Sequence, residues 1–215
     1  MALLYSAAME AWILFTLLAV AMQSVRTAAQ KQIAQSISAA STTLVRYLFG
    51  LPFALGYYFS LSHFYQGEEF VGNTVFYKAS TLAAIAQIFA TVFLIKALTL
   101  RNFAVGTALV KTEALLTAVL GAVFFSTALS SIAYLSVFLG VVGVLIASNW
   151  KVSWQDLVEN ESIKYGVGAG LGFALASLWI REASLSLGVP RLLSASTVLL
   201  YMVAIQTVLC LLFVA

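Results

Sequence analysis

Charged residues that lie inside apolar stretches are the ones in this chain that could do chemistry. Arg46, Lys111 and Glu113 each lie within a long run of aliphatic and aromatic residues. A charge at the centre of a lipid bilayer costs about 2.5–3.5 kcal/mol on insertion scales, so such a residue usually faces a partner or a water-filled cavity. Cationic side chains attract carboxylates and phosphates, and a carboxylate can balance a cation or exchange a proton. The three residues therefore predict a site for a charged solute or ion.

Three further residues extend this candidate set. Gln87 lies near the middle of another apolar run, where it could contact a solute or hydrogen-bond to a neighbouring helix. Arg26 lies near the end of its run, where a long side chain could also reach the membrane interface. Arg181 is included because it matches Arg26 in an internal repeat described below. No catalytic residue, metal ligand or cofactor is expected.

Composition indicates where these residues must be placed. The chain has 215 residues, of which 62% are hydrophobic and 9% are charged, whereas a soluble domain carries about 25% charged residues. A soluble surface with so few charges would expose large apolar patches and aggregate. The net charge of +3 is scattered, and no basic cluster indicates a nucleic-acid partner. The composition favours an all-α polytopic membrane protein.

Seven apolar runs are long enough to cross a bilayer, which takes about 20 residues. The runs cover about 8–29, 39–62, 76–99, 103–126, 129–149, 164–187 and 192–215. We therefore predict seven transmembrane helices joined by short connections. Helices one and three end on the membrane side on which helices two and four begin. Because of this, four cations and one carboxylate should share one half of the bilayer: Arg26, Arg46, Lys96, Lys111 and Glu113. A vestibule lined by these charges would attract an anionic group.

An internal repeat appears when the chain is shifted by 155 residues. Arg26 then matches Arg181, and Ala40-Ser41-Thr42 matches Ala195-Ser196-Thr197. The repeat unit holds five helices, and an odd number means that the second copy enters the membrane from the opposite side. We predict a first five-helix repeat over residues 1–155 and the first two helices of an inverted second repeat over 156–215. Two full copies would need about 310 residues, so three further helices are expected.

Short motifs carry a family resemblance. They are Leu44-Val45-Arg46-Tyr47 in the second run, Thr112-Glu113-Ala114 in the fourth, Gly140 to Leu145 in the fifth and Trp179 to Ala183 in the sixth. In these segments the chain resembles the EamA-like ten-helix branch of the drug/metabolite transporter superfamily. Two departures are Ala114, where proline is usual, and Phe125 to Ala128, where a Gly-Glu-Arg type of turn is common. The resemblance implies ten helices in two inverted repeats that move small metabolites or amino acids.

These observations together predict a secondary active transporter that exports small metabolites, such as amino acids or organic anions, by alternating access. No ATP-binding motif is found, so a gradient would supply the energy. An enzyme is not expected, because His63 and Asp156 are the only His and Asp and both lie outside the predicted helices. A non-transporting scaffold or assembly subunit stays open as the alternative function.

The expected partners are a small-molecule solute and the lipid bilayer, with no nucleic acid, and a homodimer stays open. The expected location is a bacterial inner (cell) membrane. Two lines of reasoning disagree on orientation. The count of Lys and Arg at the two sides places the N-terminus outside, whereas the family resemblance implies that it is inside.

Overall fold

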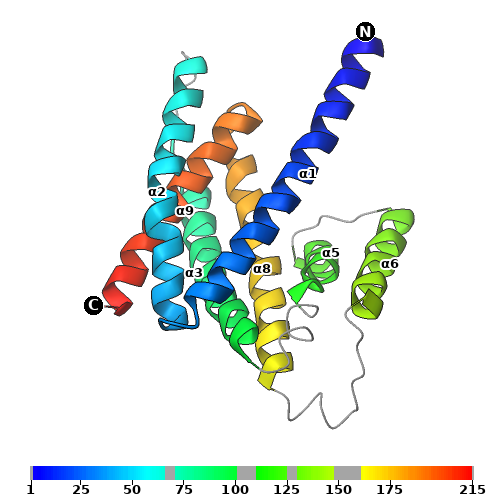
Figure 1. Cartoon of the computed structure of the whole chain (residues 1–215). Helices are drawn as coiled ribbons and strands as arrows, with labels where there is room; N and C mark the ends of the chain where they lie inside the picture. The colour runs from blue at the N-terminus through cyan, green and yellow to red at the C-terminus, as the bar shows by residue number, and fades with distance from the viewer. Residues whose placement is uncertain (1, 66–70, 101–109, 125–129, 148–160, 215) are drawn as a thin grey trace.

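The structure is a computed structural model, and it describes residues 2–65, 71–100, 110–124, 130–147 and 161–214. All regular secondary structure in these residues is helical (Figure 1), which confirms the all-α prediction. In chain order the helices are α1 (Ala2–Ile33), α2 (Ala39–Phe64), α3 (Thr74–Thr99), α5 (Glu113–Phe124), α6 (Ser131–Ala147), α8 (Glu161–Ser186) and α9 (Arg191–Val214).

Length and composition make five of these helices suitable for crossing a membrane. They are α2, α3, α8, α9 and the Ile13–Ile33 part of α1, with 21 to 26 residues each. The described parts of α5 and α6 are apolar but shorter, at 12 and 17 residues. Large apolar side chains such as Phe53, Leu212 and Phe213 are exposed on the outside of the bundle, as lipid-facing side chains should be. The chain is a multi-pass membrane protein.

The fourth predicted helix is corrected by the structure. We predicted a continuous helix over 103–126, with Lys111 and Glu113 well inside it. The described helix instead begins at Glu113, and Lys111 and Thr112 form a turn before it. Thr112 supplies the carbonyl that accepts the Leu116 N–H, and a carboxylate in the first turn interacts favourably with the helix macrodipole. Residues 101–109 lie outside the described part of the chain.

Two long helix pairs form the centre of the molecule. The helix α3 packs along α8, and α2 packs along α9, while α3 also contacts α9. The helix α5 packs on α8 and α6 packs on α5 at one side of these pairs, and α1 crosses the front to touch α3 (Figure 1). In the same view α1 runs downward and α2 upward, whereas α8 runs upward and α9 downward. These opposite directions are those that an inverted repeat requires. That α1 and α2 superpose on α8 and α9 stays a prediction.

Small residues allow α3 and α8 to approach closely. A Cβ atom added at Gly168 would lie 2.8 Å from the Phe93 ring, and one at Gly172 would lie 2.8 Å from the Ala90 Cβ. The glycine edge of α8 therefore packs directly on α3. Gly140 and Gly143 in α6 show no such close approach, because a Cβ at either position would meet nothing within 4 Å.

Local hydrogen bonds fix where the central helices begin and end. Asn73 caps α3, since its Oδ1 accepts the Phe76 N–H at 2.8 Å, and its Nδ2 donates to the Ser186 carbonyl at the end of α8 at 2.6 Å. Gly188 has a φ of 68°, a left-handed conformation that favours glycine after a helix C-terminus. The turn at Gly188 leads directly into α9, which packs back against α8 and α3.

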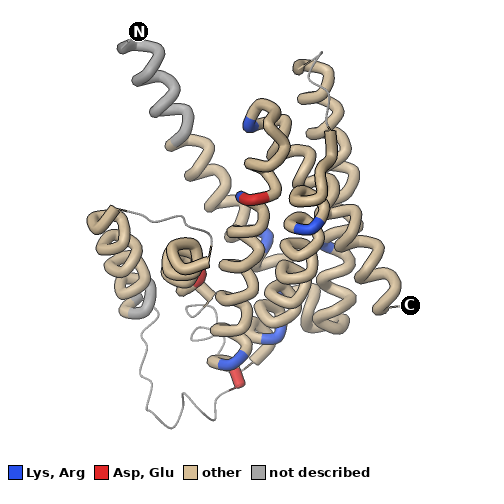
Figure 2. The backbone as a smooth tube through the Cα atoms, turned by 180° about the vertical axis from the view of Figure 1, so that it is seen from behind, with Lys and Arg blue, Asp and Glu red and all other residues tan. Residues whose placement is uncertain are grey.

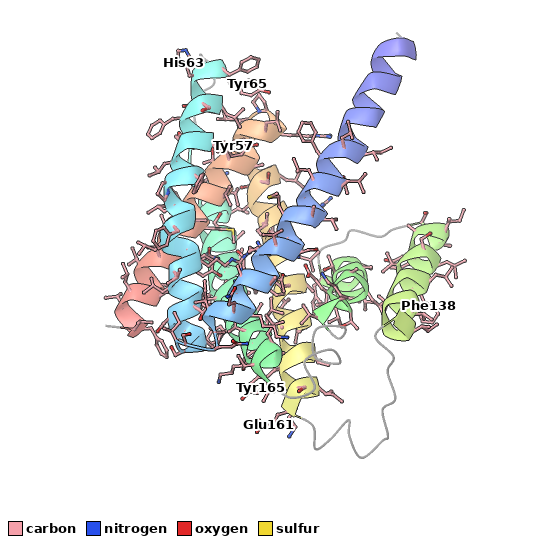
Figure 3. The ribbon with its side chains drawn as sticks, viewed as in Figure 1. Tyr57, His63, Tyr65, Phe138, Glu161 and Tyr165 are labelled. Carbon is pink, nitrogen blue, oxygen red and sulfur yellow. The ribbon has the colours of Figure 1, made fainter. Side chains whose placement is uncertain are left out.

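Charged residues are sparse along the described helices (Figure 2). His63 and Tyr65 lie at the upper end of α2, whereas Glu161 and Tyr165 lie at the lower end of α8 (Figure 3). The only histidine of the chain is therefore at the opposite end of the bundle from the start of α8.

Candidate functional site

A polar cavity of about 230 Å³ lies where five helices meet. Its lining comes from α1 (Gln23, Arg26, Thr27), α2 (Arg46), α3 (Gln87, Leu94), the residues around the start of α5 (Val110, Lys111, Glu113) and α8 (Phe173, Ala176, Ser177, Ile180). Typical ligand pockets span about 300–1,000 Å³. The volume therefore suits a small metabolite better than a drug-sized molecule.

The charges on this lining are mainly positive. Arg26, Arg46 and Lys111 contribute three cations and Glu113 contributes one carboxylate. Among the described residues, none of the four forms an ion pair with another side chain. Positive charge on low-dielectric walls attracts anions from solution.

Arg46 is held by a chain of hydroxyl groups. Its Nη1 donates to the Thr91 hydroxyl at 2.9 Å, the Thr91 and Tyr47 hydroxyls lie 3.2 Å apart, and the Tyr47 hydroxyl donates to the Gln87 carbonyl at 3.3 Å. A guanidinium can only donate and a carbonyl can only accept. The hydrogens therefore point in one direction, from Arg46 through Thr91 and Tyr47 to the backbone of α3. This arrangement uses one nitrogen of Arg46, and the remaining guanidinium donors are left for the cavity.

Glu113 is positioned by the contact between α5 and α8. Its Oε1 accepts a hydrogen bond from the Ser177 hydroxyl at 3.3 Å. The first helical residue of α5 thus lies against the middle of α8, which places a carboxylate beside the cations of α1 and α2. A carboxylate in this position can bind a positively charged group of a solute or carry a proton.

Gln87 connects the cavity to α9. Its Oε1 accepts a hydrogen bond from the Gln206 Nε2 at 2.8 Å. Gln206 is 1% exposed and lies on a helix that contributes no residue to the cavity lining. Gln87 therefore forms the expected interhelical hydrogen bond and also lines the cavity, while its contact with a solute stays a prediction.

Five of the six predicted site residues come together in this cavity: Arg26, Arg46, Gln87, Lys111 and Glu113. Arg181 does not line it and is exposed on α8. Lys96, expected in the same half of the bilayer, lies over the ring of Tyr165 at 5.2 Å, outside the cavity.

Sequence reasoning missed the uncharged polar residues of the site. Gln23 lies three residues before Arg26 and four before Thr27, and all three line the cavity. This spacing was a usable signal, because residues three and four apart share one face of a helix. Nothing in the sequence indicated Ser177 or Gln206, since isolated Ser and Gln are common in membrane helices as interhelical contacts.

A second cavity, of about 400 Å³, lies between α2, α3 and α9. It is larger, but it carries no charged residue and its lining is almost wholly apolar, from Ala40 and Ile85 to Leu209 and Phe213. A solute with a charged group would find no partner there, so the polar cavity is the candidate functional site.

A multi-pass helical bundle with a charged cavity between its helices is an arrangement typical of membrane proteins that bind small solutes. The model of the EamA-like transporter family matches residues 10–149, which is more than half of the chain. The chain belongs to the EamA-like transporter family, and this confirms the resemblance seen in its motifs. Members of this family are membrane transporters of small molecules rather than enzymes. Comparisons with curated proteins and with solved structures find no match.

Proposed function

We propose that the protein is a secondary active transporter that exports small metabolites, such as amino acids or organic anions, by alternating access. The observation that carries this proposal is the polar cavity, which Arg26, Arg46 and Lys111 line together with Glu113. A solute with an anionic group would be held by the cations. The Glu113 carboxylate could bind the ammonium group of a solute that carries both charges.

Arg46 is the residue that we assign to the anionic group. The planar guanidinium can donate two parallel hydrogen bonds to a carboxylate, which an ammonium group cannot do. The hydrogen bond to the Thr91 hydroxyl already orders the guanidinium, so Arg46 would lose little side-chain freedom when a solute binds.

Alternating access is supported by the arrangement of the helices. The opposite directions of α1–α2 and α8–α9 agree with an inverted repeat (Figure 1), and transporters of that design bind substrate at the interface between the repeats. The cavity takes residues from α1, α2, α3 and α5 on one side of that division and from α8 on the other. The proposed division is the one at residue 155, and the proposed location is a bacterial inner membrane.

Transport can be tested with the full chain reconstituted in liposomes. We expect uptake or exchange of radiolabelled leucine or succinate to respond to a pH gradient, with no transport of the lipophilic cation tetraphenylphosphonium. Empty liposomes and liposomes with Arg46→Gln are the controls. If a folded, inserted protein moves none of these solutes under any gradient, the scaffold alternative replaces this proposal.

A further inference from the structure

Gln206 is a buried amide whose hydrogen bonds have a defined direction. Its Nε2 donates to two acceptors on α3, the Gln87 Oε1 at 2.8 Å and the Ala84 carbonyl at 3.3 Å. Gln206 itself is 1% exposed. It is the side chain through which α9 reaches the polar residues of α3.

The Ala84 carbonyl decides which end of the Gln206 amide faces α3. A backbone carbonyl can only accept a hydrogen bond, and an amide nitrogen can only donate one. The reversed amide would place the Gln206 oxygen against the Ala84 oxygen, with no hydrogen between them. The nitrogen of Gln206 must therefore face α3.

The orientation of Gln87 follows from that of Gln206. Because a donor faces it, Gln87 must present its own oxygen to α9. Its nitrogen, with two hydrogens, has no hydrogen-bond partner among the described residues. Since the Gln87 side chain lines the polar cavity, the polar group that it offers there is the NH₂ end.

This orientation matches the charges around it. Arg46 reaches α3 at Thr91, four residues after Gln87, and four helical residues span about 6 Å. Gln87 and Thr91, the residue that holds Arg46, therefore lie about one helical turn apart on α3, and both Gln87 and Arg46 line the cavity. A carboxylate in the cavity offers two charged acceptor oxygens to these donors, whereas a primary amide offers one neutral oxygen, and its NH₂ group cannot accept from either donor.

We propose that Gln206 is a positioning residue for solute selectivity, which directs the Gln87 NH₂ group into the cavity beside Arg46 and so favours a carboxylate over the corresponding amide. This inference rests on the proposed function in taking the cavity as the solute site. Gln206 does not touch the solute and acts through Gln87. A purely structural role for the Gln206–Gln87 hydrogen bond, joining α9 to α3, is the competing explanation.

Binding measurements in nanodiscs separate the two explanations. The probes are succinate and succinamide, which differ only in carboxylate against amide. The readout is the side-chain NH₂ signal of Gln87 in ¹⁵N-glutamine-labelled protein, identified by its loss in Gln87→Met. We expect succinate to shift this signal and succinamide to leave it in place.

The variant Gln206→Met keeps the length of the side chain and removes both hydrogen bonds, so the Gln87 amide can turn over. The variant should lose about one hydrogen bond to a charged solute, so we expect the Kd for succinate to rise roughly tenfold, the equivalent of about 1.4 kcal/mol. In a Gln87→Met background, Gln206→Met should change that Kd no further. Thr207→Val is the matched control, because Thr207 is equally buried on α9 but its hydroxyl bonds to Val203 of its own helix.

Three results would overturn the inference. The first is that succinate does not shift the Gln87 signal in the wild type, and the second is that Gln206→Met binds succinate with the wild-type Kd. The third is that Gln206→Met raises the Kd as much in the Gln87→Met background as it does in the wild type. These measurements do not require transport. If Gln87 responds as expected in a chain that transports nothing, this inference stands and the transport proposal fails. If the chain transports succinate but Gln206→Met binds it with the wild-type Kd, the transport proposal stands and this inference fails.

Discussion

Single charged residues inside apolar helices were a strong signal in this sequence. Arg46 and Glu113 could be identified because a charge in hydrocarbon has a cost that only a cavity or a partner can offset. Repeat symmetry, and not this cost, suggested Arg181, which lies exposed on α8 outside the cavity. The cost of a buried charge could not indicate Ser177, because an uncharged hydroxyl costs little in a helix where it can bond to its own backbone.

Replacing Arg46 with lysine should weaken transport and leave membrane insertion intact. The charge is kept, but the planar pair of donors is lost, and the Thr91 hydroxyl that now accepts from Nη1 at 2.9 Å would compete for the ammonium group. We expect KM for an anionic solute to rise roughly tenfold, the equivalent of about one charged hydrogen bond. Uptake in liposomes measures this, and an unchanged KM would remove Arg46 from the binding site.

Replacing Glu113 with glutamine should abolish the response of transport to a pH gradient before it abolishes solute binding. The amide is the same size and can still bond to Ser177, but it cannot carry a proton. The titratable and charged groups that share the cavity with Glu113 are Lys111 beside it, Arg26 on α1 and Arg46 on α2.

The matched control for this change is Glu182→Gln, an exposed carboxylate on α8 outside the cavity. Flux measured with and without a pH gradient distinguishes the two variants. If Glu113→Gln still transports with full pH dependence, Glu113 is a structural partner of Ser177 and the coupling proton travels elsewhere.

At the scale of elements, the apolar runs predicted which segments are helical but not which helices pack together. Helices such as α3 and α9 are apolar nearly all round, so they carry no amphipathic stripe that identifies a partner. The helix α8 is an exception, because Gly168 and Gly172 are four residues apart, a spacing typical of membrane helices that approach a neighbour closely. The start of α5 was missed for a different reason, since apolar residues lie on both sides of the polar Lys111 and Thr112 and the whole stretch predicts one membrane-spanning run.

Two glycine substitutions test the α3–α8 interface. In Gly172→Ala the new Cβ would lie 2.8 Å from the Ala90 Cβ and 3.2 Å from the Ala86 carbonyl oxygen, so the helices must separate. Overpacking of this kind costs about 1–3 kcal/mol and should lower the Tm by about 2–12 °C. Gly140→Ala meets nothing within 4 Å, so it should be neutral or stabilising because alanine favours helix. Thermal unfolding in detergent measures both, and equal Tm values would contradict the close packing.

At the scale of the whole molecule, the cavity exists only because segments far apart in the sequence meet. Arg26 on α1 and Ser177 on α8 line the same space, and the sequence contained no pattern that joined them beyond the repeat. The repeat did predict that α8 would run opposite to α1, and the helices do run in opposite directions (Figure 1).

A cysteine at Ser177 should be reached by water from one side of the membrane. The experiment uses a Cys210→Ala background, which removes the single native thiol. We expect Ser177→Cys to react with a charged, membrane-impermeant thiol reagent and to be protected by a bound solute. Leu171→Cys, exposed on the same helix outside the cavity, should face lipid and stay unlabelled. Equal labelling at the two positions would show that the cavity is not a separate aqueous compartment.

The hydroxyl chain behind Arg46 has a further consequence. Passing a proton along such a chain requires a group at one end that releases a proton and a group at the other end that keeps one. Here the chain starts at a guanidinium, which stays protonated in proteins, and ends at the Gln87 backbone carbonyl, which does not hold a proton. The chain from Arg46 to Tyr47 therefore holds the guanidinium in place and does not conduct protons, and we expect a protonmotive cycle in this protein to use the Glu113 carboxylate of α5 instead.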